Sequence, residues 1–221
     1  MRRFNQIHLP VKKIVIERPG GYQRLQIKEF TTPTPQNHEV LIDVSAAGVN
    51  FADVFIRLGL YKSAKAFVGW PITPGFDFSG KVIRCGRDVS YLVGGTPVFG
   101  VTRFGGYSSH LCVPRAQVFL IPEGSKFDAD QWAAFPTVFL TAYHGLFQNI
   151  CIRPRMKILV HSAAGGVGGA LLQLAKIADC FVVAVVGGTH KVPCALGYGA
   201  DFVIDKSRDN LWAEAEKICP D

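Results

Sequence analysis

The chain has 221 residues, of which 48% are hydrophobic and 19% charged, so it can bury a sizeable core and is not a disordered chain. Its net charge of +7 suits nucleic acid or acidic lipid, but the basic residues are dispersed and not clustered with aromatics, which favours a solvated surface with a few lysines for an anionic ligand. The six cysteines form no C-x-x-C pair and no N-x-S/T sequence occurs, which indicates a reducing, intracellular compartment.

Residues 1–17 carry charges throughout and lack the apolar segment of a secretory signal, although the basic start leaves organelle targeting open. The longest apolar run, residues 181–186, is too short to span a bilayer. We therefore expect a cytoplasmic protein without a transmembrane segment, with an organelle or the surface of a membrane as the alternatives.

Short β-branched segments separated by glycine and proline turns fill the chain up to about residue 125. One helical stretch, "NFADVFIRLGLY", begins at Asn50. This pattern predicts an antiparallel, barrel-like β domain, whose strands are "VKKIVIE", "RLQIKEF", "EVLIDVSAAG", "SGKVIRCG", "TPVFGV" and "YSSHLCVP".

From about residue 127 the pattern changes to two helices broken near Pro136, followed by alternating strands and helices. The strands are expected at 158–160, 181–186 and 201–205, with a second helix that has Pro193 in its first turn. The order βαβαβ is one mononucleotide-binding half of a Rossmann domain. The first helix is expected to bury one face made of Val167, Ala170, Leu171, Leu174, Ala175 and Ala178.

A glycine-rich turn joins the first of these strands to its helix, as in a dinucleotide-binding loop. Gly165 would let the backbone approach the phosphates, Gly168 would let the helix pack closely, and the helix N-terminus would attract the anion. Ala163 replaces the usual first glycine, which is tolerable where no positive φ is required. The alternative is a tight turn with a purely structural role.

The end of the second strand indicates which dinucleotide is bound. An NAD-binding fold would place an Asp or Glu there, whereas this chain has Gly187, Gly188 and Thr189. Lys191 and Lys206 could instead meet a 2′-phosphate, which a carboxylate would repel. The sequence therefore favours NADPH, and for each lysine the alternative is an ordinary solvated charge.

Five segments of the chain carry a family resemblance: "AAGVNFADVFIRLGLY", "PITPGFDFSGKV", "GGYSSHLCVP", "FLTAYHGLF" and "VHSAAGGVGG". In this order and spacing they resemble the medium-chain dehydrogenase/reductase superfamily over nearly the whole chain, and within it the zinc-free quinone oxidoreductase and ζ-crystallin group. The early "GGYQRLQIKEF", together with "HSAAGGVGG" and "EKICPD", is most similar to vesicle amine transport protein homologues. The resemblance implies a GroES-like substrate domain over 1–130, and linking helices with a partial NADPH-binding Rossmann domain over 131–221.

In the zinc-dependent members of this superfamily a cysteine, a histidine and a second cysteine hold the catalytic metal. The matching positions here are Asn50, Phe76 and Thr137, none of which can serve as a zinc ligand in that arrangement. The cysteine-rich loop for a structural zinc is also missing, so we predict no metal. Oxidation of an unactivated alcohol would then lack stabilisation of the alkoxide.

A quinone or an α,β-unsaturated carbonyl delocalises the charge that arrives with hydride, so hydrogen-bond donors can suffice. The resemblance implies that Asn50 and Thr141 lie near the nicotinamide and that Tyr61 lies where substrate enters, which makes Asn50 and Tyr61 the catalytic candidates. Alternatively, Asn50 caps the adjacent helix, Thr141 is an ordinary helix residue, and Tyr61 is a half-buried turn aromatic. The predicted cofactor residues are Asn50, Thr141, Ala163, Ala164, Gly165, Gly166, Val167, Gly168, Gly187, Gly188, Thr189, Lys191 and Lys206.

The chain departs from the resemblance at three points. Phe55 replaces a tyrosine common in the quinone oxidoreductases, and Arg155 follows Pro154 where the group tends to have glycine, so this turn must change its backbone or accept strain. A complete doubly wound domain would need about 100 further residues after Asp221, so we expect a fragment with half a cofactor site. Asp53 is expected to make a structural hydrogen bond within the β domain.

Two functions of different classes remain open at this stage. The first is an NADPH-dependent reductase of quinones or enones, a homodimer when complete. The second is a non-catalytic scaffold that binds NADPH or a membrane surface, as the vesicle-protein resemblance allows, or an inactive fragment. Nucleic-acid binding through the positive charge is the weakest alternative, because it would require a steeply salt-dependent affinity.

Overall fold

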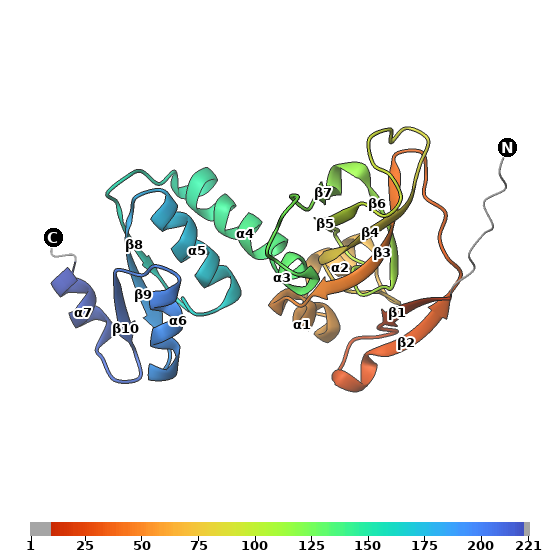
Figure 1. The fold of residues 1–221 in the computed structure, drawn as a ribbon. Coiled ribbons are helices and arrows are strands. Elements are labelled where there is room, and N and C mark those ends of the chain that lie inside the picture. Colours follow the sequence, from red (N-terminus) through yellow and green to blue (C-terminus); the bar gives the residue numbers. More distant parts are fainter. Residues whose placement is uncertain (1–9, 219–221) are drawn as a thin grey trace. The chain divides into compact units, whose positions relative to one another are not determined.

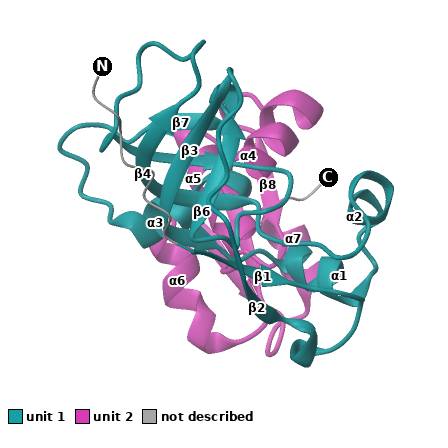
Figure 2. Ribbon diagram, turned by 90° about the vertical axis from the view of Figure 1, so that its right-hand side faces the viewer, with its two compact units in different colours: residues 1–137 teal, residues 138–221 magenta. Residues whose placement is uncertain are grey.

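The computed structural model describes residues 10–218, which form two compact units divided after Thr137: residues 10–137 and residues 138–218 (Figure 2). The residues outside 10–218 include the first nine of the amino-terminal segment examined for a signal, and the last three of "EKICPD". The division between the units follows Thr137, whereas the predicted division at 130/131 falls inside helix α3 (Ala129–Ala134).

Unit 1 contains a five-stranded antiparallel sheet with the strand order β6-β3-β4-β5-β7 (Figure 1). Alternate side chains of these strands, such as Val40, Ile42 and Phe78, are fully buried in one core. The core of the β domain is therefore built from the β-branched and apolar segments that predicted strands in the sequence. The strands are β3 (Glu39–Gly48), β4 (Asp77–Cys85), β5 (Pro97–Val101), β6 (His110–Pro114) and β7 (Val118–Leu120).

A second, two-stranded antiparallel sheet and two helices complete unit 1. Ile16 and Ile56 form a second core with Ala64 and Ile72. The β domain that the sequence predicted is confirmed, and the short strand β7 is an element that it did not predict. The elements of this part are β1 (Val11–Val15), η1 (Tyr22–Arg24), β2 (Gln26–Phe30), α1 (Phe51–Leu58), α2 (Lys62–Phe67) and η2 (Arg115–Gln117).

The two predicted helices around Pro136 are present as α3 and α4 (Pro136–Tyr143). Asp128 and Gln131 form a capping box at the start of α3, in which the Gln131 N–H donates to Asp128 Oδ1 at 2.8 Å. Pro136 opens α4, where its missing N–H costs nothing because the first N–H groups of a helix have no partner within it. A π-helical turn, η3 (His144–Ile150), follows α4.

Unit 2 is a three-stranded parallel sheet with the order β10-β9-β8, formed by β8 (Lys157–Val160), β9 (Phe181–Val186) and β10 (Phe202–Asp205). Strand β9 buries its alternate residues on opposite faces: Val182, Ala184 and Val186 belong to one core, and Val183 and Val185 to another. The helices are α5 (Gly166–Ile177), η4 (Thr189–Lys191), α6 (Val192–Gly197) and α7 (Leu211–Ile218).

Residues of α5 and α6 share the core on the first face of the sheet, and residues of α7 share the core on the second. This βαβαβ order confirms the predicted partial Rossmann-like sheet. The predicted face of α5 is partly wrong, because Leu172 is fully buried and Val167 is 37% exposed. The buried side of α5 includes Gly168 and Gly169, so the close approach made at the glycines sets the rotation of the helix.

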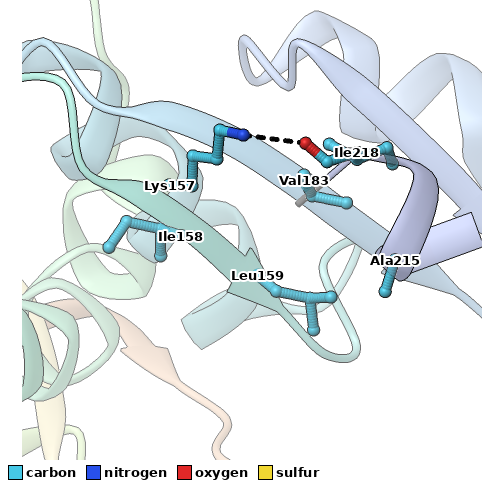
Figure 3. Close-up of a pocket in the computed structure, with 6 residues that line it drawn as sticks. All are labelled: Lys157, Ile158, Leu159, Val183, Ala215 and Ile218. Carbon is cyan, nitrogen blue, oxygen red and sulfur yellow. Dashed lines mark hydrogen bonds between the residues drawn. The ribbon is translucent and has the colours of Figure 1, made fainter. Parts of the chain in front are cut away.

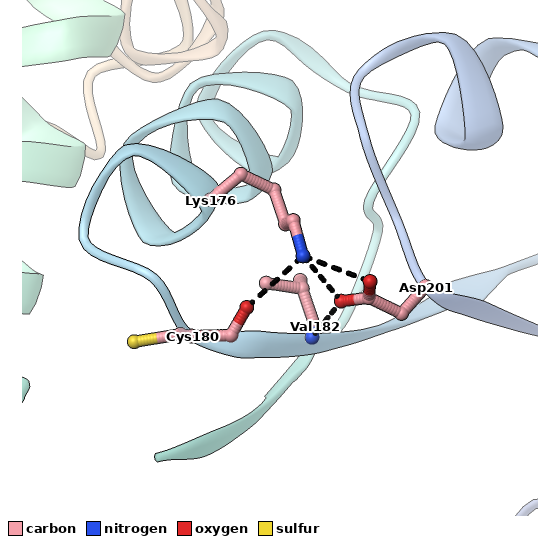
Figure 4. A network of polar contacts seen from close by, with 4 residues as sticks. All are labelled: Lys176, Cys180, Val182 and Asp201. Atoms are coloured by element: carbon pink, nitrogen blue, oxygen red, sulfur yellow. Dashed lines mark hydrogen bonds and ion pairs between the residues drawn. The ribbon is translucent and has the colours of Figure 1, made fainter. Parts of the chain in front are cut away.

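A polar network fixes the far end of α5 to the start of β9 (Figure 4). Lys176 Nζ donates to both carboxylate oxygens of Asp201 at 2.8 Å and to the carbonyl of Cys180 at 3.2 Å. Asp201 in turn accepts the backbone N–H of Val182 at 2.7 Å. Burial alone would raise the pKa of Asp201, but the bonds from Lys176 and Val182 outweigh it and hold the pKa below 3.8.

Strand β8 forms one edge of this sheet within the described residues. Beside it lies a small apolar pocket, lined by β8, by Val183 of β9 and by Ala215 and Ile218 of α7 (Figure 3). Lys157 Nζ donates to the carbonyl oxygen of Ile218 at 2.8 Å, which joins β8 to the end of α7. The pocket therefore reflects the packing of α7 over the second face of the sheet.

The turn before β8 is strained, as the departure from Pro-Gly predicts. Arg155 has a φ of 69°, in the left-handed region that favours glycine. Its N–H donates to the carbonyl oxygen of Asp179 at 2.7 Å, so the turn is anchored to the end of α5 despite the strain.

Candidate functional site

The carboxyl ends of the three parallel strands bring together the predicted dinucleotide-binding residues other than Asn50 and Thr141. Strands β8, β9 and β10 end at Val160, Val186 and Asp205, and the glycine-rich loop, the segment 187–191 and Lys206 follow them directly. Because parallel strands end at the same edge of a sheet, these three segments share one edge, the place where open α/β sheets bind their ligands.

The N-terminus of α5 presents uncapped backbone donors to this edge. Gly165 is the N-cap residue, and no side chain accepts a hydrogen bond there. The first N–H groups of a helix have no intrahelical carbonyl, and they carry the positive end of the helix dipole. An anion could therefore act as the cap that the sequence does not supply.

Gly168 has a steric role that the structure makes explicit. A Cβ atom on Gly168 would lie 2.3 Å from the carbonyl oxygen of Ser162, whereas one on Gly165 would lie 3.2 Å from the same oxygen. Gly168 is thus required for the approach of α5 to the loop. The left-handed residue of the loop is Ser162, with a φ of 52°, and the fully buried Ala163 needs no positive φ.

Glycine stands where a carboxylate would be expected in an NAD-binding fold, and two lysines follow at the same edge of the sheet. A Cβ atom built on Gly187 would touch Lys206 Cε at 3.6 Å, so the Lys206 side chain lies over the position of the missing acid. Lys191 ends η4 and is exposed, as is Lys206. Within residues 10–218, neither ammonium group makes an ion pair with a carboxylate.

Asp205 is a residue at this edge that the sequence analysis missed. Its carboxylate accepts the hydroxyls of Thr189 and Ser207, each at 2.6 Å, and the N–H of Ser207 at 3.0 Å. The bond from Ser207, followed by that from Thr189, lowers its pKa below 3.8. The Thr189 hydroxyl proton is therefore committed to Asp205, which ties the end of β9 to the end of β10. An acidic residue ending the third strand was the available signal.

In unit 1, Asn50 is the N-cap residue of α1 and forms a capping box with Asp53. Asp53 Oδ2 accepts the N–H of Asn50 at 2.9 Å and the hydroxyl of Tyr107 at 3.0 Å, and Asp53 Oδ1 accepts the N–H of Gly75 at 2.9 Å. Asp53 makes the expected structural hydrogen bonds, and Asn50 stands at the N-cap position that its alternative role requires. Burial raises the pKa of Asp53, and these three bonds only partly offset the effect.

The side chain of Asn50 contacts a second buried carboxylate that the sequence analysis also missed. Asn50 Nδ2 donates to Asp77 Oδ2 at 2.7 Å. Asp77 Oδ1 accepts the backbone N–H of Thr137 at 2.9 Å and its hydroxyl at 2.5 Å. Asp77 is 1% exposed, and burial raises its pKa, with a smaller contribution from the charge of Asp53.

The other two candidates differ in their surroundings. Tyr61 is half-buried at the start of α2, and its ring packs edge-to-face against Phe76 and Phe104 at centroid distances of 5.9 and 6.5 Å. This is the half-buried aromatic that was its alternative. Thr141 is exposed on α4 and belongs to unit 2, whereas Asn50 and Tyr61 belong to unit 1.

The residues at the metal positions of the zinc enzymes have other partners here. Asn50 and Thr137 both bond Asp77, and Phe76 packs with aromatic rings. Among residues 10–218, no group of three or more His, Cys, Asp or Glu side chains could hold a metal ion.

The fold is a GroES-like domain followed by a partial Rossmann-like parallel sheet, and its structural neighbours are quinone oxidoreductases of the medium-chain dehydrogenase/reductase type. Residues 36–123 match the family model of the alcohol dehydrogenase GroES-like domain.

The individual relatives are quinone oxidoreductases and VAT-1 homologues, which confirms the resemblance predicted from the sequence. The rat synaptic vesicle membrane protein VAT-1 homolog is 35% identical over 213 residues, 96% of this chain and 52% of its own length. Human quinone oxidoreductase is 34% identical over 200 residues, 90% of this chain and 59% of its own. Escherichia coli quinone oxidoreductase, solved in complex with NADPH, matches with a TM-score of 0.84 and 31% identity over 94% of this chain and 62% of that one.

The chain thus spans about half the length of the curated relatives that it matches. Searched for membrane spans, the described helices include none of the length and apolar character needed to cross a bilayer.

Proposed function

We propose that this chain provides the substrate domain and the adenosine-phosphate side of an NADPH-dependent, zinc-independent oxidoreductase that reduces a quinone or an α,β-unsaturated carbonyl. The observation that carries the proposal is the carboxyl edge of the parallel sheet. Uncapped helix donors, two lysines without carboxylate partners and a glycine in place of the usual acid occur there together. The names of the quinone oxidoreductase relatives support the reaction class.

The residues of the edge fit the chemistry of the cofactor. The N–H groups at the start of α5 would hold the pyrophosphate, and Gly165 leaves the backbone accessible there. Lys191 and Lys206 would hold the 2′-phosphate, since an ammonium attracts the charge that a carboxylate would repel. We propose that other residues of the glycine-rich loop and of the segment 187–191 also contact the cofactor. They are Ala163, Ala164, Gly166, Val167, Gly168, Gly187, Gly188 and Thr189.

Bound NADPH would supply the hydride. The contribution of unit 1 is then a hydrogen-bond donor toward the oxygen of the acceptor, where negative charge develops. We assign this role to Asn50, whose amide retains one N–H beyond the one given to Asp77. Tyr61 would line the substrate entrance, and Thr141 would contact the nicotinamide side of the complete site.

The binding part of this proposal can be tested on the 221-residue chain. Titration with NADPH and NADH, followed by nucleotide fluorescence, should show tighter binding of NADPH. The double variant Lys191→Ala/Lys206→Ala should lose at least tenfold in NADPH affinity and little in NADH affinity. Lys157→Ala removes one positive charge at the opposite end of β8 and serves as the control. Equal affinity for both nucleotides, or equal losses in the control, would contradict the 2′-phosphate assignment.

The catalytic part requires turnover with ortho- and para-quinones and enones. We expect NADPH oxidation that depends on the acceptor, and a loss of turnover in Asn50→Ala. Retained NADPH affinity without turnover on any acceptor would favour the second candidate function, a binding scaffold, which the names of the VAT-1 relatives support. Homodimer formation and a cytoplasmic location remain part of the proposal. They are tested by the mass of the particle in solution and by cell fractionation.

A further inference from the structure

We infer that Asp77 is a positioning residue for Asn50: its buried carboxylate fixes the side-chain amide so that Asn50 presents an N–H donor to the ligand. The inference rests on the proposed function, because it concerns how the proposed donor is oriented. The evidence for it is the geometry of the hydrogen bonds that Asp77 accepts from Asn50 and Thr137 in unit 1.

The orientation of the amide follows from donor and acceptor chemistry. An ionised carboxylate can only accept hydrogen bonds, so the group of Asn50 that faces Asp77 Oδ2 at 2.7 Å must be the nitrogen Nδ2. The opposite orientation would set the amide oxygen against the carboxylate. One N–H of Nδ2 is then committed, and the second remains available as a donor.

Asp77 is itself held rigidly. Its other oxygen receives two hydrogen bonds from Thr137, and the residue paired with it across β3 and β4 is Gly48. A Cβ atom on Gly48 would lie 2.8 Å from Asp77 Cβ and 3.0 Å from Asp77 Oδ2. A glycine opposite the carboxylate therefore leaves it the space that it occupies. A positioning role requires this rigidity, because a mobile partner would not define one amide orientation.

The backbone of Asn50 is fixed independently by Asp53. The two carboxylates therefore bind different parts of Asn50. Asp53 holds its main chain at the start of α1, and Asp77 orients its side chain. This division provides a matched pair of variants. In Asp77→Asn, the single amide oxygen should still accept the two hydrogen bonds that Thr137 donates. The new amide N–H should then point toward Asn50. Asn50 would have to turn its own amide around, so that its oxygen faces this N–H. Asp53→Asn leaves the Asn50 side chain bonded to Asp77.

The first readout needs no cofactor. In the full chain labelled with 15N-asparagine, the Asn50 side-chain amide, assigned by its loss in Asn50→Ala, should exchange slowly with solvent because one proton is bonded to Asp77. In Asp77→Asn this protection should fall at least tenfold, and in Asp53→Asn it should persist. An Asn50 amide with the same exchange rate in Asp77→Asn and in the parent chain would overturn the inference.

The second readout separates positioning from a merely structural role. We expect Asp77→Asn to lower kcat for quinone reduction ten- to hundredfold with the KM for NADPH within about twofold. In the Asn50→Ala background the same change should have no further effect, whereas multiplied losses would overturn the inference. If the parent chain reduces no acceptor, the activity proposal fails, and the exchange measurement alone decides whether Asp77 fixes the amide.

Discussion

Two regions of the molecule differ in whether their polar groups have partners. One is the polar cluster around Asp53 and Asp77 in unit 1, and the other is the carboxyl edge of the sheet in unit 2. In the first, two buried carboxylates accept hydrogen bonds from donors that are buried or half-buried. In the second, among the residues that the structure describes, the N-terminus of α5 has no side-chain cap and two exposed lysines have no carboxylate partners. A satisfied cluster sets geometry before any ligand arrives, whereas an unsatisfied edge gains its missing partners from the ligand.

The largest effect is expected at the glycine-rich loop. Gly168→Ala would place Cβ 2.3 Å from the Ser162 carbonyl oxygen, and we expect unit 2 to lose about 3 kcal/mol of unfolding free energy. Urea unfolding followed by circular dichroism measures this loss. Gly165→Ala, with a closest distance of 3.2 Å, is the control and should lose less than about 1 kcal/mol. Similar losses in the two variants would contradict the assignment of close packing to Gly168.

The next effect concerns the satisfied cluster. Asp53→Ala leaves the N–H groups of Asn50 and Gly75 and the hydroxyl of Tyr107 without their acceptor, so we expect a loss of about 2–3 kcal/mol. Asp43→Ala, which removes an exposed aspartate from β3 of the same unit, should change stability by less than about 0.5 kcal/mol. A small loss for Asp53→Ala would mean that water replaces the carboxylate, and that the cluster is not preorganised.

The two units should also respond to pH with opposite signs. Burial raises the pKa of Asp53 and Asp77 above 3.8, so their contribution to stability is present below that value and is lost as pH rises through the folded-state pKa. Hydrogen bonds lower the pKa of Asp201 and Asp205, so their contribution is present above 3.8 and is lost as pH falls through the lowered pKa.

Hydrogen exchange corrected for intrinsic rates can follow each unit separately. From pH 4 upward we expect protection in unit 1 to decrease, and from pH 4 downward we expect protection in unit 2 to decrease. Asp77→Asn should flatten the dependence in unit 1 and leave that of unit 2 unchanged. If protection changes with pH in the same direction in both units, burial does not dominate the pKa of the unit 1 carboxylates, or hydrogen bonding does not dominate that of the unit 2 carboxylates.

The smallest effect is expected at the strained turn before β8. Arg155→Gly removes the cost of a left-handed backbone at a φ of 69°, and we expect a gain of about 0.5–1 kcal/mol after the extra chain entropy of glycine is subtracted. Thermal unfolding of unit 2 measures the gain. Arg155→Ala keeps the Cβ atom and should give no gain, and an equal gain in both variants would assign the effect to the arginine side chain.

Local pattern was sufficient to predict most of the fold. The apolar run of β9, the break at Pro136 and the glycine turn before α5 each depend on neighbouring residues, and each is present in the structure. The rotation of α5 was not predictable in this way, because hydrophobicity alone favoured Val167, whereas the close contact at Gly168 turned Leu172 into the core.

The candidate site also contains residues that local sequence could predict and residues that it could not. Residues 163–168 and 187–191 form two continuous segments that a motif can identify. Asp77 escaped notice because its partners Asn50 and Thr137 lie 27 and 60 residues away along the chain, and the pairing of β3 with β4 brings it to Asn50. Asp205 became visible only when the parallel register set the end of β10 beside the end of β9.

Gly48 has a consequence for how sequences with this fold can diverge. A side chain at position 48 would collide with Asp77 and also with the carbonyl oxygen of Ala133, at 2.4 Å, in α3. Substitutions at positions 48 and 77 are therefore not independent. Any residue larger than glycine at position 48 requires both a shorter side chain at position 77 and a displacement of α3. We expect the two positions to covary among homologues, and a carboxylate at 77 to occur together with glycine at 48.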